Sequence, residues 1–292
     1  MQTKKVVSVL LAGVTTLSMA MPVLAANGDP NLVVTPDTLY STPIEANSSV
    51  TLGLMPADAH YQRTGFDSAD AAANGLEVSK INLGADKIST DFTYGSKTVN
   101  GLYAGTVTVK GKKGQYGPAS LHIVNKNNPS AGIDMTVYVE ADTVQDDVTV
   151  ASVEAVDLTD GGDTYEYAGD LNVEAAKKET KNPFNASVGS AQSYPTAGDA
   201  LYSLAEANSL SFVQDKGYVQ SITDSTGKVL SWYTTEDWTY YGWNYCVVRN
   251  GAQVSEGDIV SAAVLEVEEG DSVYWAFGTQ EQAEDYFNAL TE

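Results

Sequence analysis

Apolar and polar residues alternate most regularly near the middle of this 292-residue chain. The apolar positions are Ile133, Met135, Val137 and Val139, and the residues between them are mostly polar. An alternation with a period of two is the pattern of a β-strand that buries one face of a sheet. The pattern therefore predicts a strand over residues 133–140, with its apolar side chains directed into a core.

Shorter apolar runs before this segment predict an all-β domain. We expect strands at residues 32–34, 50–54, 102–110 and 119–124. Glycine and proline at 111–114 and 116–118 supply turns between them. Short strands with regular turns are typical of an immunoglobulin-like β-sandwich, which we place over residues 27–143. An alanine-rich stretch at 68–74 fits either a short helix or a surface loop.

An acidic and polar stretch at 143–147 is a suitable domain junction, and a further strand is expected at 148–156. A helix is then expected to begin at Thr196, because the spacing from Thr196 to Asp199 is that of a capping box. The apolar residues of this helix are Ala200, Leu201, Leu204 and Ala207. They form one stripe, which would dock on a sheet.

The C-terminal part of the chain carries further turn and cap signals. Asn-Gly at 250–251 is typical of a type I′ turn between two strands. Glu-Gly-Asp occurs at 256–258 and again at 269–271, and each copy predicts a turn that leads into a strand. A second capping-box spacing, at 279–282, predicts a final amphipathic helix. We therefore expect the second domain to combine a sheet with helices.

The first 26 residues have the features of an export signal. Lys4 and Lys5 form a basic start, residues 6–20 are an apolar core, and residues 23–25 are a small-residue cleavage site. This pattern assigns residues 1–26 to a signal peptide and predicts a secreted, extracellular protein. No other apolar run approaches the roughly 18 residues that a membrane-spanning helix needs, so membrane insertion is not expected.

Charge narrows the range of partners. The formal net charge is −22, and the predicted signal peptide contains two lysines and no acidic residue, so its removal brings the charge to −24. A protein this acidic repels phosphate backbones and anionic polymers, and nucleic acid is therefore not an expected partner. Cys246 is the single cysteine, which excludes an internal disulfide. Its position within a predicted strand is typical of a small buried apolar residue.

The residues that support catalysis are scarce. The chain has two histidines, His60 and His122, and neither lies in a recognised catalytic or metal-binding motif. Asp157, Asp160 and Asp163 surround a Gly-Gly turn, but their spacing misses that of a calcium-binding loop. We therefore expect no catalytic residue, no metal site and no required cofactor, and the chain is not expected to be an enzyme.

Aromatic residues are concentrated between positions 232 and 245, where they occupy seven of fourteen positions. They are Trp232, Tyr233, Trp238, Tyr240, Tyr241, Trp243 and Tyr245. Two interpretations compete: the rings pack on one another as a compact lid, or they form an exposed platform for a flat or cyclic ligand. Tyrosine hydroxyls and Asn244 would orient such a ligand. A corrinoid, a sugar ring or an apolar side chain of a partner protein would each fit.

Four segments between residues 145 and 278 carry a family resemblance. They are Asp199-Ala-Leu201, Gly217-Tyr-Val-Gln-Ser-Ile222, Trp243-Asn-Tyr-Cys-Val247 with the following Asn250-Gly251, and Gly270-Asp-Ser-Val273. Their order resembles the transcobalamin-like C-terminal domain family, a small bacterial module also catalogued as a domain of unknown function. The chain departs from the family pattern by an expanded connection at 232–241 and an additional Gly-Asp unit at 256–263.

The resemblance implies an α+β module in which a helix packs on a small sheet, with a binding role instead of a catalytic one. In animal cobalamin carriers a related module forms the smaller half of the corrinoid site. Cobalamin or another corrinoid is therefore the first ligand that the resemblance suggests.

Together these observations predict a mainly β protein with a smaller α+β part. The predicted order is a signal peptide (1–26), an immunoglobulin-like β-sandwich (27–143) and a transcobalamin-like domain with a terminal helix (144–292). The leading hypothesis is a secreted bacterial, non-catalytic protein that captures a small ligand, with a corrinoid as first candidate, on the aromatic residues and Asn244. The alternative is a cell-surface adhesion or assembly component that binds a surface protein or a glycan.

Overall fold

The computed structural model describes residues 31–161, 163–179, 181–184, 192–254 and 260–291. The predicted signal peptide and the first Glu-Gly-Asp turn lie outside the described residues. The chain divides into two compact units, one with residues up to 115 together with 119–139, the other with residues 116–118 and 140 onward. Within the described part, the helices are too short or too polar to cross a membrane.

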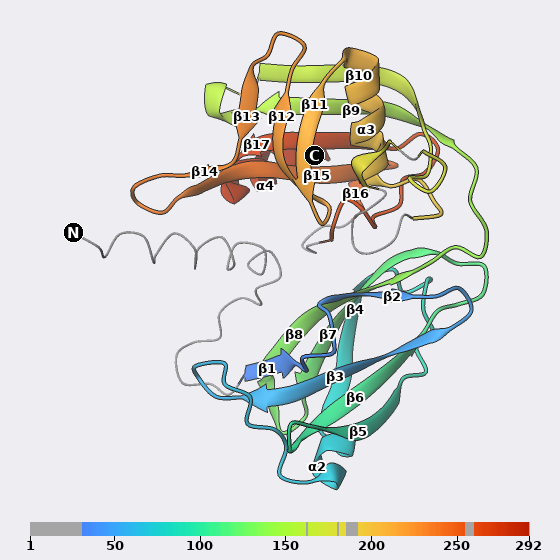
Figure 1. Ribbon diagram of the computed structural model, residues 1–292, viewed down its shortest axis with the longest axis vertical. Helices are drawn as coiled ribbons and strands as arrows, with labels where there is room; N and C mark the ends of the chain where they lie inside the picture. Colours follow the sequence, from blue (N-terminus) through green and yellow to red (C-terminus); the bar gives the residue numbers. More distant parts are fainter. Residues whose placement is uncertain (1–30, 162, 180, 185–191, 255–259, 292) are drawn as a thin grey trace. The chain divides into compact units, whose positions relative to one another are not determined.

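The first unit is a sandwich of two four-stranded sheets (Figure 1). One sheet has the order β1 (Asn31–Val34), β3 (Ser49–Ala57), β6 (Leu102–Lys110) and β5 (Thr93–Val99). The other has the order β2 (Ser41–Ile44), β8 (Asn128–Val139), β7 (Gly117–Asn125) and β4 (Leu76–Leu83). The β1–β3, β3–β6, β5–β6 and β4–β7 pairs are antiparallel, and β2 runs parallel to β8. The predicted mainly β fold class is confirmed.

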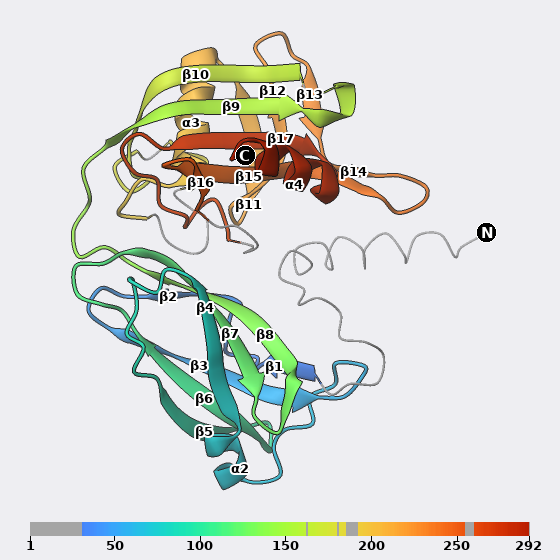
Figure 2. The same ribbon diagram turned by 180° about the vertical axis from the view of Figure 1, so that it is seen from behind.

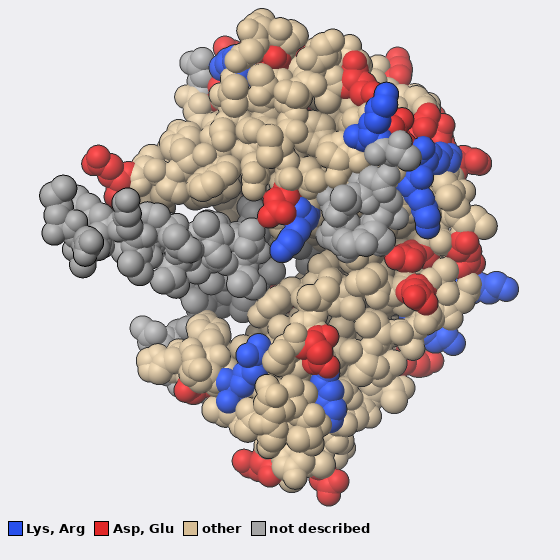
Figure 3. Space-filling model, in the orientation of Figure 1, with Lys and Arg blue, Asp and Glu red and all other residues tan. Residues whose placement is uncertain are grey.

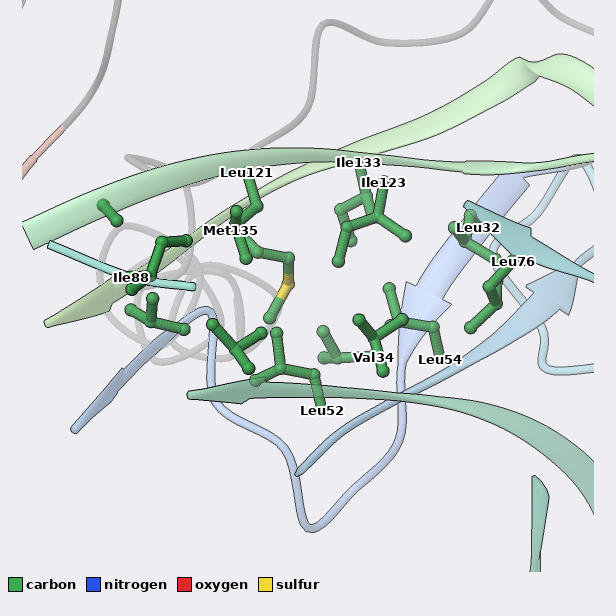
Figure 4. Close-up of a cluster of buried hydrophobic side chains, with 14 of the residues drawn as sticks. Leu32, Val34, Leu52, Leu54, Leu76, Ile88, Leu121, Ile123, Ile133 and Met135 are labelled. Carbon is green, nitrogen blue, oxygen red and sulfur yellow. The ribbon is translucent and has the colours of Figure 1, made fainter. Parts of the chain in front are cut away.

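The core of the first unit lies between its two sheets (Figure 4). Leu52 and Leu54 enter it from β3, and Leu121 and Ile123 enter it from β7. The alternation that the sequence showed is confirmed, because Ile133, Met135, Val137 and Val139 of β8 are all buried in this core. The alanine-rich stretch is a short helix, α2 (Ala69–Asn74), whose first turn is capped by the Ser68 side chain.

The second unit is built on a six-stranded central sheet. Along the sheet lie β10 (Asp163–Val173), β9 (Val148–Asp157), β17 (Ser272–Gly278), β15 (Tyr240–Arg249) and β14 (Tyr233–Thr234). A short strand, β16 (Ala252–Gln253), also pairs with β15. The β9 and β17 strands run parallel, and the other pairs are antiparallel. A 3-10 turn (Leu158–Asp160) separates β9 from β10.

Two layers cover the central sheet (Figures 1 and 2). One face carries helix α3 (Ala197–Asn208) and a three-stranded sheet of β11 (Ser211–Asp215), β12 (Tyr218–Thr223) and β13 (Val229–Ser231). The other face carries helix α4 (Gln280–Ala289). As a result β15 is buried on both sides, with Val247 on one face and Cys246 on the other. Burial raises the pKa of the Cys246 thiol to about 12, so the thiol stays protonated.

Three local predictions from the sequence are confirmed. Both helices begin with complete capping boxes, Thr196 with Asp199 in α3 and Thr279 with Gln282 in α4. The Asn-Gly turn between β15 and β16 has positive φ angles at both residues, 53° and 79°, as a type I′ turn requires.

One local prediction is wrong in its described part. Residues 260–263, expected to form a strand, lie in a buried segment without strand pairing. Carbonyl groups of this segment and of the residues just after it accept hydrogen bonds from α3 instead. Ala197 N–H donates to Leu265 O at 2.9 Å, and Gly198 N–H donates to Ala262 O at 2.8 Å. These are N–H groups of the first helical turn, which find no partner within the helix itself.

Asp199 is buried at the start of α3, where it caps the helix and also bonds to a residue outside it. Its Oδ2 accepts hydrogen bonds from the backbone N–H and the hydroxyl of Thr196, and its Oδ1 accepts one from Asn182 at 2.6 Å. Burial raises the pKa of Asp199 to about 7, although these donors favour the charged form. The folded state therefore binds a proton here at a pH where the unfolded chain has lost it.

We predict that the second unit loses stability as the pH rises from about 4 to about 7, by on the order of 4 kcal/mol from Asp199 alone. The raised pKa makes the folded state the stronger proton binder in that window, so the free energy of unfolding falls until the folded carboxyl has ionised. Thermal unfolding of wild type and Asp199→Asn at pH 5 and pH 8 checks this. Parallel pH profiles for the two proteins would contradict it.

Candidate functional site

The aromatic run of the sequence forms a β-hairpin at one edge of the central sheet. Residues 232–241, named the aromatic arm from here on, comprise β14, a turn and the start of β15. Tyr233 pairs with Tyr241, and Thr234 pairs with Tyr240. The hairpin projects beyond the rest of the sheet (Figures 1 and 2). The connection therefore extends the sheet instead of folding back over its edge.

The turn of the aromatic arm is held by its own hydrogen bonds. Thr235 N–H donates to Thr239 O at 3.0 Å, and Trp238 N–H donates to Thr235 O at 3.1 Å. The Thr235 hydroxyl also accepts from Thr239 N–H at 3.1 Å and binds the carboxylate of Asp237. The bond from Thr235 lowers the pKa of Asp237. The tip is thus ordered without help from other elements.

Four rings of the aromatic arm are exposed. Trp238 at the tip is 71% exposed, Trp232 and Tyr233 are each 43% exposed, and Tyr240 is 41% exposed. The rings also pair, since Tyr233 stacks on Tyr241 with centroids 4.7 Å apart and Trp232 stacks on Tyr240 with centroids 6.2 Å apart. Self-packing and exposure, which the sequence left as alternatives, therefore occur together.

The remaining residues of the predicted site lie within the unit. Trp243 is 6% exposed, and its indole N–H donates to Leu230 O at 3.1 Å. Tyr245 stacks on Trp275 with centroids 5.2 Å apart, and its hydroxyl donates to Val260 O at 2.6 Å. Burial raises the pKa of Tyr245 well above its usual value. These two rings therefore take part in the packing of the unit.

Asn244 lies between Trp243 and Tyr245 in the sequence and on the opposite face of β15. It is half-buried, and its side-chain amide donates to Gly242 O at 3.3 Å. The sequence had no signal for which residues of the run would be buried. Strand register decides that, because Trp243 pairs with Phe277 and Tyr245 with Trp275, two residues of the covered strand β17.

Charge is nearly absent from the aromatic arm. Glu236 and Asp237 at the turn are the only charged residues between positions 232 and 245. Figure 3 shows acidic side chains at the outer end of this projection and an otherwise uncharged surface along it. The arm therefore offers apolar ring faces along its length and negative charge only at its tip.

His122 and Asp157, two of the residues weighed for catalysis or metal binding, have structural partners. His122 Nδ1 lies 2.8 Å from Asp134 Oδ1 on an exposed face of the first unit. Asp157 accepts from Thr159 N–H and forms an ion pair with Lys228 at 3.3 Å. Among the described residues, no three His, Cys, Asp or Glu side chains are grouped as a metal site requires.

Three solved structures that align with this chain are distant from it in sequence. No protein-family model matches the chain, and no curated protein matches it. Domains 6-7 of surface layer protein SbsC align with 87% of this chain and 94% of that chain, at 13% identity and a TM-score of 0.25. SbsC domains 4 and 5 align with 38% of this chain and 53% of that chain, at 15% identity and a TM-score of 0.23.

The Escherichia coli adhesin FdeC aligns with 45% of this chain and 35% of that chain, at 16% identity and a TM-score of 0.25. This chain thus spans about half the length of the SbsC fragment with domains 4 and 5 and about a third of the adhesin. At such TM-scores the alignments define no shared fold. The transcobalamin-like resemblance stays a prediction from the sequence.

We predict that Trp243→Ala lowers the free energy of unfolding by about 3–5 kcal/mol, because it empties a buried site and removes the indole hydrogen bond to Leu230 O. Chemical denaturation followed by circular dichroism measures this. Tyr167→Ala is the control, since Tyr167 on the opposite edge strand is 55% exposed and its truncation should change stability by no more than about 0.5 kcal/mol. Equal effects of the two substitutions would contradict the buried role of Trp243.

We predict a second effect at the tip, where Trp238 has a φ of 68°. Residues other than glycine adopt this left-handed conformation at a cost, and hairpin loops usually place glycine there. Trp238→Gly should therefore be more stable than Trp238→Ala by about 1 kcal/mol, because only glycine removes the backbone strain. Denaturation of both variants tests this, and an alanine variant as stable as the glycine variant would contradict it.

Proposed function

We propose that this chain is an exported, non-catalytic binding protein whose aromatic arm engages a component of a cell surface. The observation that carries the proposal is the exposure of four rings on a hairpin that is ordered by its own hydrogen bonds. Export rests on the predicted signal peptide.

Exposed aromatic rings contribute less to the stability of the fold than buried ones, but they can contribute to a binding interface. Burying one large apolar side chain contributes roughly 1.5–3 kcal/mol, and Trp238, at 71% exposed, gains little of this. Trp238 adds backbone strain at a turn that a glycine would form more easily. Tryptophan and tyrosine are enriched among the residues that dominate binding energy, because each offers a large contact area with few rotatable bonds. A binding role therefore explains why the aromatic arm exposes these rings.

The charge of the protein limits what the aromatic arm can bind. The chain has 38 acidic and 16 basic residues, and the arm itself adds only negative charge. Long-range repulsion disfavours anionic polymers and anionic lipid surfaces. The negative electrostatic potential of the protein therefore favours neutral or basic partners on a cell surface, either a protein or a glycan.

We predict that the protein without residues 1–26 binds intact cells of the organism that encodes it, and that Trp232→Ala combined with Trp238→Ala lowers the bound amount at least tenfold. Tenfold corresponds to about 1.4 kcal/mol, which is modest for two exposed rings at an interface. Binding of fluorescently labelled protein, measured by flow cytometry, gives the result. Tyr167→Ala is the matched control, because it removes an exposed ring at the opposite edge of the sheet.

Two results would overturn the proposal. Equal loss in Tyr167→Ala and in the double variant would place the binding surface outside the aromatic arm. Saturable quenching of tryptophan fluorescence by cobalamin or cobinamide, without any binding to cells, would favour the small-ligand capture that the transcobalamin-like resemblance implies. A linear, non-saturating response to both corrinoids is the expected result.

A further inference from the structure

Trp232 and Tyr240 form a platform on one face of the aromatic arm. Their ring centroids are 6.2 Å apart, and the ring planes differ by 25°. Tyr240 lies directly over Gly242, because a Cβ atom at position 242 would sit 2.6 Å from its Oη and 2.7 Å from its Cε1. The ring can rest against the strand only because residue 242 has no side chain. The two rings thus make a nearly continuous surface across two neighbouring segments of chain.

The platform is held from two different sheets. Trp232 N–H donates to Gln220 O at 3.0 Å, which continues the pairing between β12 and β13 of the three-stranded sheet. Tyr240 belongs to β15 of the central sheet. Because the backbone at both ends is fixed by sheet hydrogen bonds, little conformational freedom remains to be lost when a ligand binds.

This face of β15 is covered only in part. Tyr240, Gly242, Asn244 and Cys246 point to the same side, since side chains alternate along a strand. Helix α4 covers this side at Cys246, which packs against its Phe287. Tyr240 and Trp232, further along, remain exposed. The half-buried amide of Asn244 lies between the covered and the open part of the face.

The chemistry of the open part suits the face of a sugar ring. A pyranose presents C–H groups on its flat face and hydroxyl groups around its edge, so it stacks on an aromatic ring while its hydroxyls bond to nearby amides. Two nearly parallel rings side by side can accept two successive sugars of one chain. The platform carries no charge, and the acidic protein around it disfavours anionic polysaccharides.

We infer that the Trp232–Tyr240 platform, flanked by Asn244, binds an uncharged polysaccharide chain of a cell surface. The inference rests on the proposed function and specifies its ligand class. A protein partner is less well matched, because the residues that dominate protein interfaces insert into well-packed pockets. Here Gly242 instead keeps the Tyr240 ring flat against its own strand.

Affinity electrophoresis provides the test. The protein without residues 1–26 has an acidic pI, so it migrates readily in native gels at pH 8. Envelope polysaccharide of the same organism is separated by anion exchange into neutral and acidic fractions, and each fraction is cast into a gel. We expect the neutral fraction to retard the wild-type protein and the acidic fraction to leave its mobility unchanged.

Gly242→Ala is the most informative variant, since it removes no aromatic group. Its new Cβ must displace the Tyr240 ring, and we expect the apparent affinity for the neutral fraction to fall at least tenfold. Tyr167→Ala lies outside the aromatic arm, at the opposite edge of the sheet, and should bind as the wild type does. Should Gly242→Ala fail to fold, as circular dichroism would show, Tyr240→Ala replaces it with the same expected loss, because Tyr240 is a surface residue.

The outcomes separate this inference from the proposed function. If cell binding depends on the aromatic arm but the neutral fraction causes no retardation, the ligand class is wrong and a protein partner takes its place. Retardation that Gly242→Ala and Tyr240→Ala leave unchanged, or retardation by the acidic fraction alone, also overturns the inference. Absence of both cell binding and retardation overturns the inference and the proposed function together.

Discussion

The burial of β15 on both faces is the constraint on which the second unit depends. On one face Trp243 bonds to Leu230 of the three-stranded sheet, and on the other Cys246 packs against Phe287 of α4. Hydrogen bonds to β17 and to the short strands β14 and β16 occupy its edges. The covered part of such a strand tolerates few changes, because its side chains alternate between two packed layers.

The two ends of β15 have opposite characters. At its C-terminal end Arg249 binds the buried carboxylate of Asp271 through two hydrogen bonds of 2.9 Å, and a third bond of 2.8 Å reaches Glu268. The two parallel hydrogen bonds from Arg249 offset the free energy that it costs to bury the charged carboxylate of Asp271. They also fix the turn before β17. At its N-terminal end the strand leaves both covering layers and becomes the aromatic arm. The same strand therefore anchors the unit at one end and presents exposed rings at the other.

Local signals in the sequence predicted much of the fold. The alternation at Ile133–Val139, the two capping boxes and the Asn-Gly turn each depend on residues within a few positions of one another, and all are confirmed. The strands that the sequence missed give weak local signals. For example, β5 (Thr93–Val99) is an edge strand with few apolar residues. It forms because it pairs with β6 along its whole length, and its own composition gives no strand signal. The segment after residue 260 was misjudged because its partner, the start of α3, lies more than sixty positions away.

The sequence by itself determined the mainly β composition, the helix starts, the acidic charge and the clustering of seven aromatic residues between positions 232 and 245. Only the tertiary structure decided which of these rings face solvent. Trp232 and Trp243 are chemically identical and eleven positions apart, yet one lies on the surface and the other in the core. The difference arises from register and from where the covering layers end, which are properties of contacts between distant segments. An uncovered stretch of strand, such as the one that carries the Trp232–Tyr240 platform, therefore has no signature in local sequence.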